Sequence, residues 1–354
     1  MTAPATQDLA PTEELLTDPS RMPRARRILL GILRSRELAI LLVLVFVVLV
    51  ATSRNSGFLF SSDGWRNFLL NPSILLLVAV GQAAVIITRN VDLSVGSVMA
   101  LTAYLTGRLF IDVPGIPIVV VFLLCLAAGA LLGLINGALT TIFKVPSLVI
   151  TLGTLYVFRG VMLTWAGSDR INAGDLPRDF LALGTKSVLQ VPVLTWVAVA
   201  VLLVVGYYLH TARGGREMYA IGSDPDAAVL YGLRVSRRVL LAFMVSGALA
   251  GLAGAFYTAR YGTVSSGVGY GIELQAVAAV VIGGVAIFGG SGTVWGAALG
   301  AFLLVTINRA LPSVGIPDFW QQAVVGALIL GAIVLDRFLA HRQAAKLARA
   351  RESA

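Results

Sequence analysis

Residues 274–308 read LQAVAAVVIGGVAIFGGSGTVWGAALGAFLLVTIN, thirty-five residues with no Asp, Glu, Lys or Arg. A single helix of this length would extend about 53 Å, whereas about 20 residues are enough to cross ~30 Å of hydrocarbon. The stretch must therefore fold back on itself. The predicted break is Gly289-Gly290-Ser291-Gly292, a run of poor helix formers. This stretch alone predicts two membrane-spanning helices.

The rest of the 354-residue chain has the same character. Hydrophobic residues make up 57% of it and charged residues only 13%, whereas soluble domains carry about 25% charged residues. Long uncharged runs predict an all-α, polytopic membrane helix bundle of about ten transmembrane helices. The ten predicted spans are residues 38–53, 72–88, 94–110, 117–140, 146–166, 191–209, 239–259, 272–288, 294–311 and 319–335.

The distribution of Lys and Arg predicts the orientation. With the N-terminus inside, the inner segments carry eighteen of the 27 basic residues. This positive-inside bias places both termini in the cytoplasm. The net charge of +9 is then explained by topology and lipid contact, and no nucleic-acid partner is expected. Residues 1–36 are predicted to be a disordered, basic cytoplasmic tail, and no cleavable signal peptide is expected.

Glycines at four-residue spacing predict close helix packing inside the bundle. Such pairs let two helix backbones approach closely in a membrane. They recur in three of the predicted spans, at Gly129, Gly133 and Gly137, at Gly247 and Gly251, and at Gly296 and Gly300. The lone Cys125 is expected to be a packing residue.

Polar residues at membrane depth are the candidate functional residues. Asp92 either caps the helix that follows it or belongs to a break that lines the solute pathway. Arg159 is expected to extend to the outer headgroups, or else to face a vestibule. The candidate pathway residues, mostly small or mildly polar, are Asn90, Asp92, Ser94, Ser97, Thr151, Thr154, Gln275 and Asn308.

The segment 211–238 is the longest charged loop between predicted spans. It contains a short helix signal, with Ser223 or Asp224 as the N-cap, Pro225 in the first turn and Gly232 as the stop. Its apolar residues exceed what a solvated loop needs. The loop is either a docking element for a cytoplasmic partner or an ordinary connection.

Several stretches together resemble one family, the permease subunits of ribose-type ABC sugar importers, which include those for rhamnose and autoinducer-2. The resemblance runs from about Arg36 to Arg337. The matching stretches are Gly81-Gln82, residues 88–97 (TRNVDLSVGS), 145–147 (VPS), 151–154 (TLGT), 222–228 (GSDPDAA), Gly283-Gly284 and Gly292.

The resemblance implies a fold like that of the cobalamin importer, with residues 37–337 as the permease domain and 338–354 as a cytoplasmic tail. It implies a bacterial inner-membrane assembly with an ATP-binding cassette ATPase, an extracytoplasmic solute-binding protein and a second permease copy or paralogue. The ATPase would carry the ATP and Mg. The residues expected to couple the permease to it are Gly222, Asp224, Ala227, Ala228 and Gly232.

Other classes of function have little support in the sequence. There is no GxxxxGK[ST] phosphate loop, HExxH or CxxC, so no catalytic residue, metal site or cofactor is expected in this chain. A secondary transporter driven by an ion gradient is the alternative. It would be expected to bury acids in mid-membrane, whereas nearly every acid here, Asp92 included, falls at a predicted span boundary. The sequence therefore favours a permease subunit for a small neutral sugar or sugar-like solute.

Overall fold

The computed structural model describes residues 36–317, 319–328, 330–331 and 334 of the chain. Most of the two predicted tails therefore lies outside the described residues. The elements, in chain order, are α2 (Arg36–Arg54), α3 (Gly57–Phe60), α4 (Ser62–Ile87), α5 (Val95–Asp112), α6 (Ile118–Phe143), α7 (Ser147–Ala166), the 3-10 helix η2 (Ala173–Asp175), α8 (Arg178–Ala182), β1 (Ser187–Val188), β2 (Val191–Pro192), α9 (Val193–Thr211), α10 (Arg213–Ser223), α11 (Pro225–Leu230), α12 (Val235–Tyr261), α13 (Ile272–Ile282) and α14 (Val294–Ser313).

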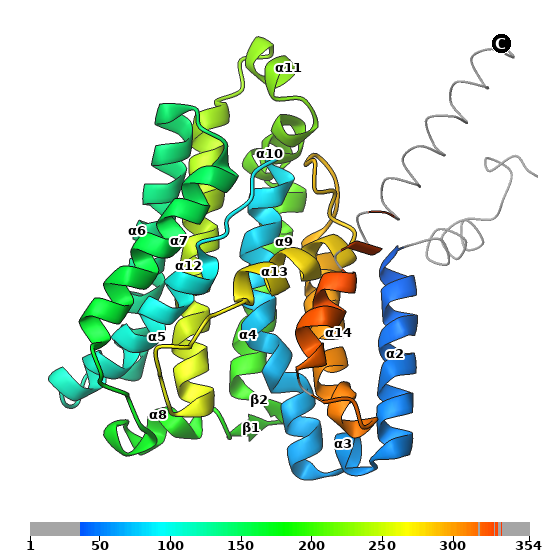
Figure 1. The fold of residues 1–354 in the computed structure, drawn as a ribbon. Coiled ribbons are helices and arrows are strands. Elements are labelled where there is room, and N and C mark those ends of the chain that lie inside the picture. Colours follow the sequence, from blue (N-terminus) through cyan, green and yellow to red (C-terminus); the bar gives the residue numbers. More distant parts are fainter. Residues whose placement is uncertain (1–35, 318, 329, 332–333, 335–354) are drawn as a thin grey trace, which may run out of the picture.

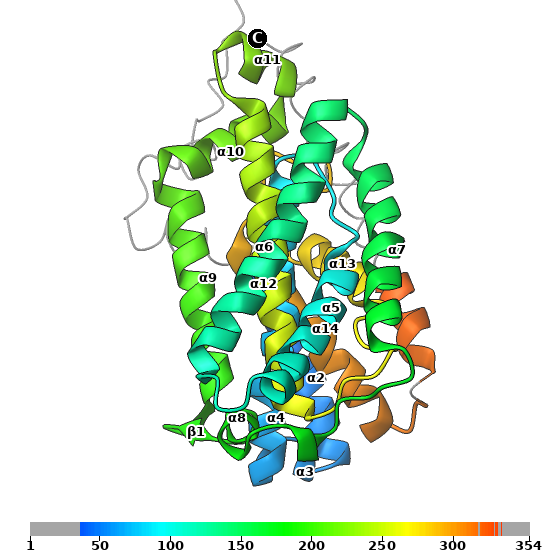
Figure 2. The same cartoon turned by 90° about the vertical axis from the view of Figure 1, so that its left-hand side faces the viewer.

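The helices form one bundle with two distinct ends. Helices α10 and α11 lie at one end, and α3, α8 and the antiparallel pair β1–β2 lie at the other (Figures 1 and 2). Seven of the described helices are long and apolar enough to cross a membrane, namely α2, α4, α6, α7, α9, α12 and α14. This confirms an all-α polytopic membrane protein.

Two predicted span boundaries are wrong. The span predicted at 272–288 is α13, which ends at Ile282 and has 11 residues, enough for about 16 Å of the ~30 Å hydrocarbon. The span predicted to start at residue 72 is α4, which begins at Ser62 and contains Pro72 within it. Within the predicted last span, residues 320–328 are helical.

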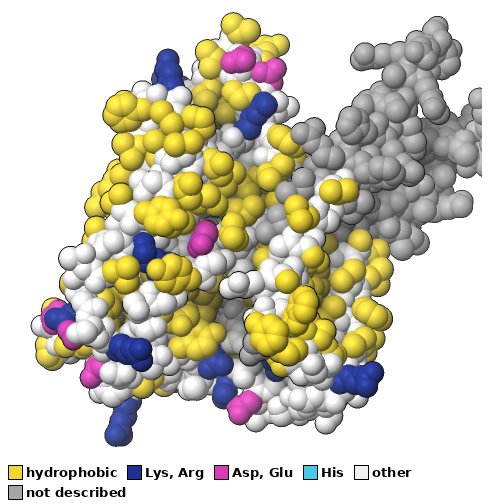
Figure 3. All heavy atoms as spheres, in the orientation of Figure 1, with side chains coloured by type: hydrophobic (Ala, Val, Ile, Leu, Met, Phe, Trp, Pro, Cys, Tyr) yellow, Lys and Arg dark blue, Asp and Glu magenta, His cyan; other side chains and the backbone are white. Residues whose placement is uncertain are grey.

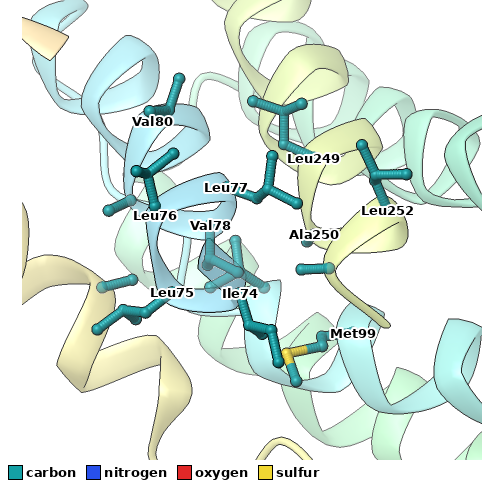
Figure 4. Close-up of a cluster of buried hydrophobic side chains, with 14 of the residues drawn as sticks. Ile74, Leu75, Leu76, Leu77, Val78, Val80, Met99, Leu249, Ala250 and Leu252 are labelled. Atoms are coloured by element: carbon teal, nitrogen blue, oxygen red, sulfur yellow. The ribbon is translucent and has the colours of Figure 1, made fainter. Parts of the chain in front are cut away.

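The core of the bundle is built on α4 and α12. Every residue of α4 from Ser73 to Ile87 is buried, so this part of the helix has no lipid-facing side. A helix buried on all sides is typically apolar around its whole circumference, as this one largely is. Figure 4 shows Leu77 of α4 beside Leu249 of α12, with Met99 of α5 below them. Helices α5, α6 and α14 pack against this centre.

The predicted glycine packing is confirmed between α6 and α12. A Cβ added at Gly129 would overlap the Gly247 carbonyl, and one at Gly133 would overlap the Phe243 carbonyl. Likewise, a Cβ at Gly300 of α14 would overlap the Ala279 carbonyl of α13. These helix pairs touch through their backbones, which suits a membrane interior, where dispersion contacts replace the hydrophobic effect.

The outer surface is suited to lipid. Large apolar side chains of α2, α6, α7 and α9 are exposed, including Phe46, Leu123, Tyr156 and Val204 at 59–69%. Figure 3 shows broad apolar areas over the middle of the molecule, with most Lys and Arg side chains toward its two ends. A water-soluble protein would hide such area, so this surface is the bilayer contact.

Candidate translocation pathway and coupling surface

The chain is interrupted between α4 and α5 by an extended segment inside the bundle. Asp92 lies in it and is 1% exposed. One carboxylate oxygen accepts from the Ser94 backbone N–H (3.0 Å) and the Ser94 hydroxyl (2.7 Å), and the other accepts from the Ser246 hydroxyl of α12 (3.1 Å). The Gln82 amide of α4, oriented to match its neighbours, pairs with both backbone groups of Asp92 (3.0 and 3.2 Å).

Asp92 therefore ties three helices to the break. The capping prediction for its side chain needs correction, because Ser94 is itself the N-cap of α5 and Asp92 binds this N-cap residue instead of the N–H groups of the first turn. The Asn136 amide of α6 adds a fourth helix by donating to the Ser94 hydroxyl (2.7 Å). A carboxylate without such donors would be costly at this depth.

Polar side chains of α7 satisfy the backbone of the same segment. The Ser147 hydroxyl accepts from the Val91 N–H (3.1 Å), and the Thr151 hydroxyl donates to the Val91 carbonyl (3.2 Å). Backbone groups that leave a helix inside a membrane protein need such partners. The predicted residues Thr151 and Thr154 are thus buried beside the break, and Thr154 donates to the Thr151 carbonyl (3.3 Å).

Two further predicted pathway residues on or next to this segment also have protein partners. The Asn90 amide donates to the Thr88 carbonyl (2.8 Å), and Ser97 of α5 donates to the Leu155 carbonyl of α7 (2.8 Å). The polar residues between 90 and 97 therefore hold the interrupted backbone in place. Their use as solute contacts stays a prediction.

A second interruption comes from the opposite end of the bundle. After α12 the chain pairs with residue 171 at Val264 and then runs inward to α13. Gly269 (φ 78°) lies so close to Gly96 of α5 that an added Cβ would overlap its carbonyl. The N-terminal ends of α5 and α13 thus meet within the bundle, and from there the two helices lead toward opposite ends (Figure 1). Broken helices that meet in this way are typical of transporter pathways.

Arg159 of α7 holds this second segment. Its side chain is 5% exposed, donates to the Val268 carbonyl (2.5 Å), and lies 4.1 Å from the centre of the Tyr270 ring. The prediction that it extends to the outer headgroups is therefore wrong. The extended segment gives the guanidinium a carbonyl and an aromatic ring as partners, so it does not need the headgroup oxygens.

Two adjoining cavities of about 480 and 630 Å³ lie beside α13 and α14, and both are lined by Gln275, Asn308 and Gln321. The smaller one also has Asn71, Tyr257, Tyr261 and Arg309 in its wall. These volumes lie in the range of small-molecule sites. Of the predicted pathway residues, Gln275 and Asn308 are therefore the two that the structure brings to these open spaces.

The residues predicted to couple the permease to an ATPase lie at the other end of the bundle. Gly222 lies in the last turn of α10, where an added Cβ would overlap the Ile87 carbonyl of α4 and lie 2.5 Å from the Gly290 nitrogen. The Gly290 N–H also donates to the Ile87 carbonyl (3.0 Å), and the Tyr219 hydroxyl of α10 donates to the Gly292 carbonyl (3.0 Å). Helix α10 thus contacts the end of α4, which precedes the break before α5, and the loop that follows α13.

Helix α11 forms as its sequence predicts. The Asp224 carboxylate accepts from the backbone N–H groups of Asp226 and Ala227 (both 3.0 Å), Pro225 occupies the first helical position, and Gly232 follows with φ 76°. Ala228 is buried at 4%, so it packs inward. The exposed apolar residues at the tip are Val229 (61%), Leu230 (88%) and Tyr231 (86%).

Sequence reasoning missed Ser246, Asn136 and Gln82 as partners of the Asp92 segment. A usable signal existed for Asn136, since it is a lone amide inside the uncharged run 113–143. Ser246 precedes Gly247 of a predicted packing motif, which also placed it in a helix contact. The tyrosines of the smaller cavity carried no such signal.

Comparisons with known proteins agree with this architecture. Residues 65–333 match the family described as "Branched-chain amino acid transport system / permease component". The autoinducer 2 import system permease protein LsrC of Enterobacter sp. (strain 638) is 36% identical over 305 residues, 86% of this chain and 88% of that protein. Its Klebsiella pneumoniae counterpart is 36% identical over 305 residues (86% and 87%), and that of Salmonella choleraesuis 34% over 302 (85% and 86%). No solved structure matches the chain.

The chain belongs to this family of membrane permease components. It is a multi-pass protein of the bacterial inner membrane and a permease component of an ABC importer, which confirms the resemblance to ribose-type permeases and disfavours the secondary transporter. Permeases of this family work with an ATPase and a binding protein.

Proposed function

We propose that the chain forms the membrane path for a small neutral sugar or sugar-like solute. A separate binding protein delivers the solute and a separate ATPase drives the transport. The observation that carries this proposal is the pair of cavities sharing Gln275, Asn308 and Gln321. Each sugar hydroxyl must keep a hydrogen-bond partner as it leaves water, and the amide and phenol groups of the lining supply donors and acceptors. Arg309, which also lines the smaller cavity, donates to the Phe58 carbonyl (2.7 Å). The curated relatives are named for autoinducer 2 import, so this solute is the first to test.

The rest of the proposed assembly follows from the two ends of the bundle. Helix α11 docks on the ATPase in the cytoplasm, which places both termini inside. The cavities then open toward the binding protein, and a second permease copy or paralogue completes a cobalamin-importer-like pair. The contact of Gly222 with Ile87 and Gly290 supports this arrangement, because it links the docking end to both broken helices.

Gln275→Leu and Asn308→Leu are each expected to lower the solute uptake rate about tenfold. The reason is that a buried solute hydroxyl left without a partner costs about 1–3 kcal/mol. The measurement is uptake of labelled autoinducer 2 by proteoliposomes that hold the permease, its ATPase and its binding protein. ATPase stimulation by the loaded binding protein should change much less.

Thr164→Leu is the matched control, because Thr164 is exposed on α7 beside the lipid-facing Val161 and Trp165. Uptake by this variant should equal that of the wild type. If the Gln275 and Asn308 variants also transported at the wild-type rate, these cavities would not be the pathway.

A further inference from the structure

A basic cavity of about 470 Å³ lies at the foot of α11, between α10 and the start of α12. Its lining residues are Arg213, Glu217, Gly232, Leu233, Arg234, Arg237 and Arg238. Four arginines and one glutamate give this lining a formal charge of +4 − 1 = +3. The cavity is separate from the spaces lined by Gln275 and Asn308.

The internal ion pairs leave part of this charge unbalanced. Glu217 accepts from Arg238 Nε (2.7 Å) and Arg213 Nε (2.9 Å). The hydrogen bond from Arg238 is the main reason that the pKa of Glu217 lies below its usual value, so Glu217 is ionised at neutral pH. Arg234 and Arg237 are exposed, and among the described residues neither forms an ion pair.

The arginines also sit at an unfavourable place on α12. Arg234 is its N-cap residue, the helix has no side-chain cap, and Arg237 and Arg238 lie in its first turn. Positive charges at a helix N-terminus oppose the helix dipole. A bound anion would relieve both this repulsion and the mutual repulsion of the arginines.

The depth of the cavity indicates where such an anion comes from. Arg238 immediately precedes the uncharged run 239–259 of α12, so the cavity lies where hydrocarbon gives way to headgroups. Lipid phosphates lie at this level, and basic pockets between membrane helices suit anionic headgroups. Guanidinium groups match phosphate oxygens in geometry as well as charge.

We propose that this cavity binds a phosphate group, and that in the membrane the phosphate belongs to an anionic phospholipid of the leaflet beside α10 and α11. Arg234 and Arg237 hold the phosphate, while the Glu217 pairs keep Arg213 and Arg238 in the wall. The lipid then rests against Gly232 and Leu233, which join α11 to α12.

The test is native mass spectrometry of the purified full-length chain titrated with phosphatidylglycerol, with phosphatidylcholine, or with inorganic phosphate. The wild type should bind phosphatidylglycerol more tightly than phosphatidylcholine. The double variant Arg234→Gln/Arg237→Gln should bind phosphatidylglycerol roughly thirtyfold more weakly, and Arg234→Lys/Arg237→Lys should recover much of the affinity. Rising salt should weaken the wild-type binding.

The matched control is Arg170→Gln/Arg178→Gln, which removes two exposed arginines from the segment between α7 and β1. It should leave phosphatidylglycerol affinity unchanged. Equal affinity of wild type and Arg234→Gln/Arg237→Gln, or an equal loss in the control, would overturn the site. Arginine-dependent binding of inorganic phosphate without any preference for phosphatidylglycerol would overturn the lipid assignment.

Discussion

A Leu230→Asp/Tyr231→Asp permease should insert into the membrane at wild-type levels and yet support at least 100-fold less ATP-driven uptake. Both side chains are more than four-fifths exposed at the tip of α11, at 88% and 86%, so neither stabilises the fold of the permease. In the proposed docked state they are buried against the ATPase. Central apolar or aromatic residues of an interface cost about 2 kcal/mol or more each when lost, and two buried carboxylates add desolvation.

The measurement is co-purification of the ATPase with the permease, together with uptake by the reconstituted importer. The matched control is Leu189→Asp, which changes an 84% exposed leucine at the opposite end of the bundle and should leave both quantities unchanged. Ala228, an obvious target from the sequence, is a poor test because it is buried and a charge there would disturb α11 itself. Normal assembly and uptake by the double variant would show that α11 does not dock.

Gly222→Ala should also lower ATP-driven uptake about 100-fold. It acts on packing inside the permease and leaves the exposed surface that docks on the ATPase unchanged. Its new methyl group would overlap the Ile87 carbonyl and lie 2.5 Å from the Gly290 nitrogen, and neither backbone atom can swing aside. Helix α10 must then separate from α4 and from the loop after α13. Overpacking of this kind costs about 1–3 kcal/mol, and the displaced α10 would transmit motion poorly to the broken helices.

The experiment compares uptake, ATPase co-purification and thermal unfolding of Gly222→Ala with those of Gly160→Ala. Gly160 lies in α7, and an added Cβ there meets no atom within 4 Å. This control should match the wild type or be slightly more stable, because alanine favours the helix. If Gly222→Ala transported as well as Gly160→Ala, the α10 contact would have no part in coupling.

The sequence predicted those features that depend on local chemistry. The cap at Asp224, the proline after it and the stop at Gly232 are short-range signals, and α11 forms where they place it. Glycine spacing also predicted that these faces of the helices pack closely, although not that α6 pairs with α12. The residues of α11 determine its form locally, and the glycines need only the absence of a side chain.

The features that the sequence did not predict depend on distant partners. A charge-free run cannot distinguish a full span from α13, which begins at the predicted residue 272 but ends at Ile282. The chain turns there at Gly284 (φ 83°), and Gly283 packs directly against the backbone of Gly296 in α14. Contacts with the Val268 carbonyl and the Tyr270 ring likewise draw Arg159 inward instead of toward the headgroups. Asp92 looked like a residue at a span boundary, yet Ser246, 154 positions away, helps to bury it.

The burial of Asp92 bears on the source of energy for transport. An acid inside the membrane is what a gradient-driven transporter would use. Here, however, three donors from Ser94 and Ser246 occupy the carboxylate, and the chain belongs to a family of permease components of ABC importers. Asp92 therefore holds the break between α4 and α5, and ATP hydrolysis supplies the energy for transport.

Uptake by proteoliposomes tests most directly whether ATP, and not an ion gradient, drives transport through this permease. The wild-type permease, with its ATPase and binding protein, should import labelled solute only when ATP is supplied, and the rate should not change when a protonophore is added or sodium is removed. The permease alone, under an imposed proton or sodium gradient, should import nothing. Gradient-driven uptake by the permease alone, abolished by Asp92→Asn, would contradict the account.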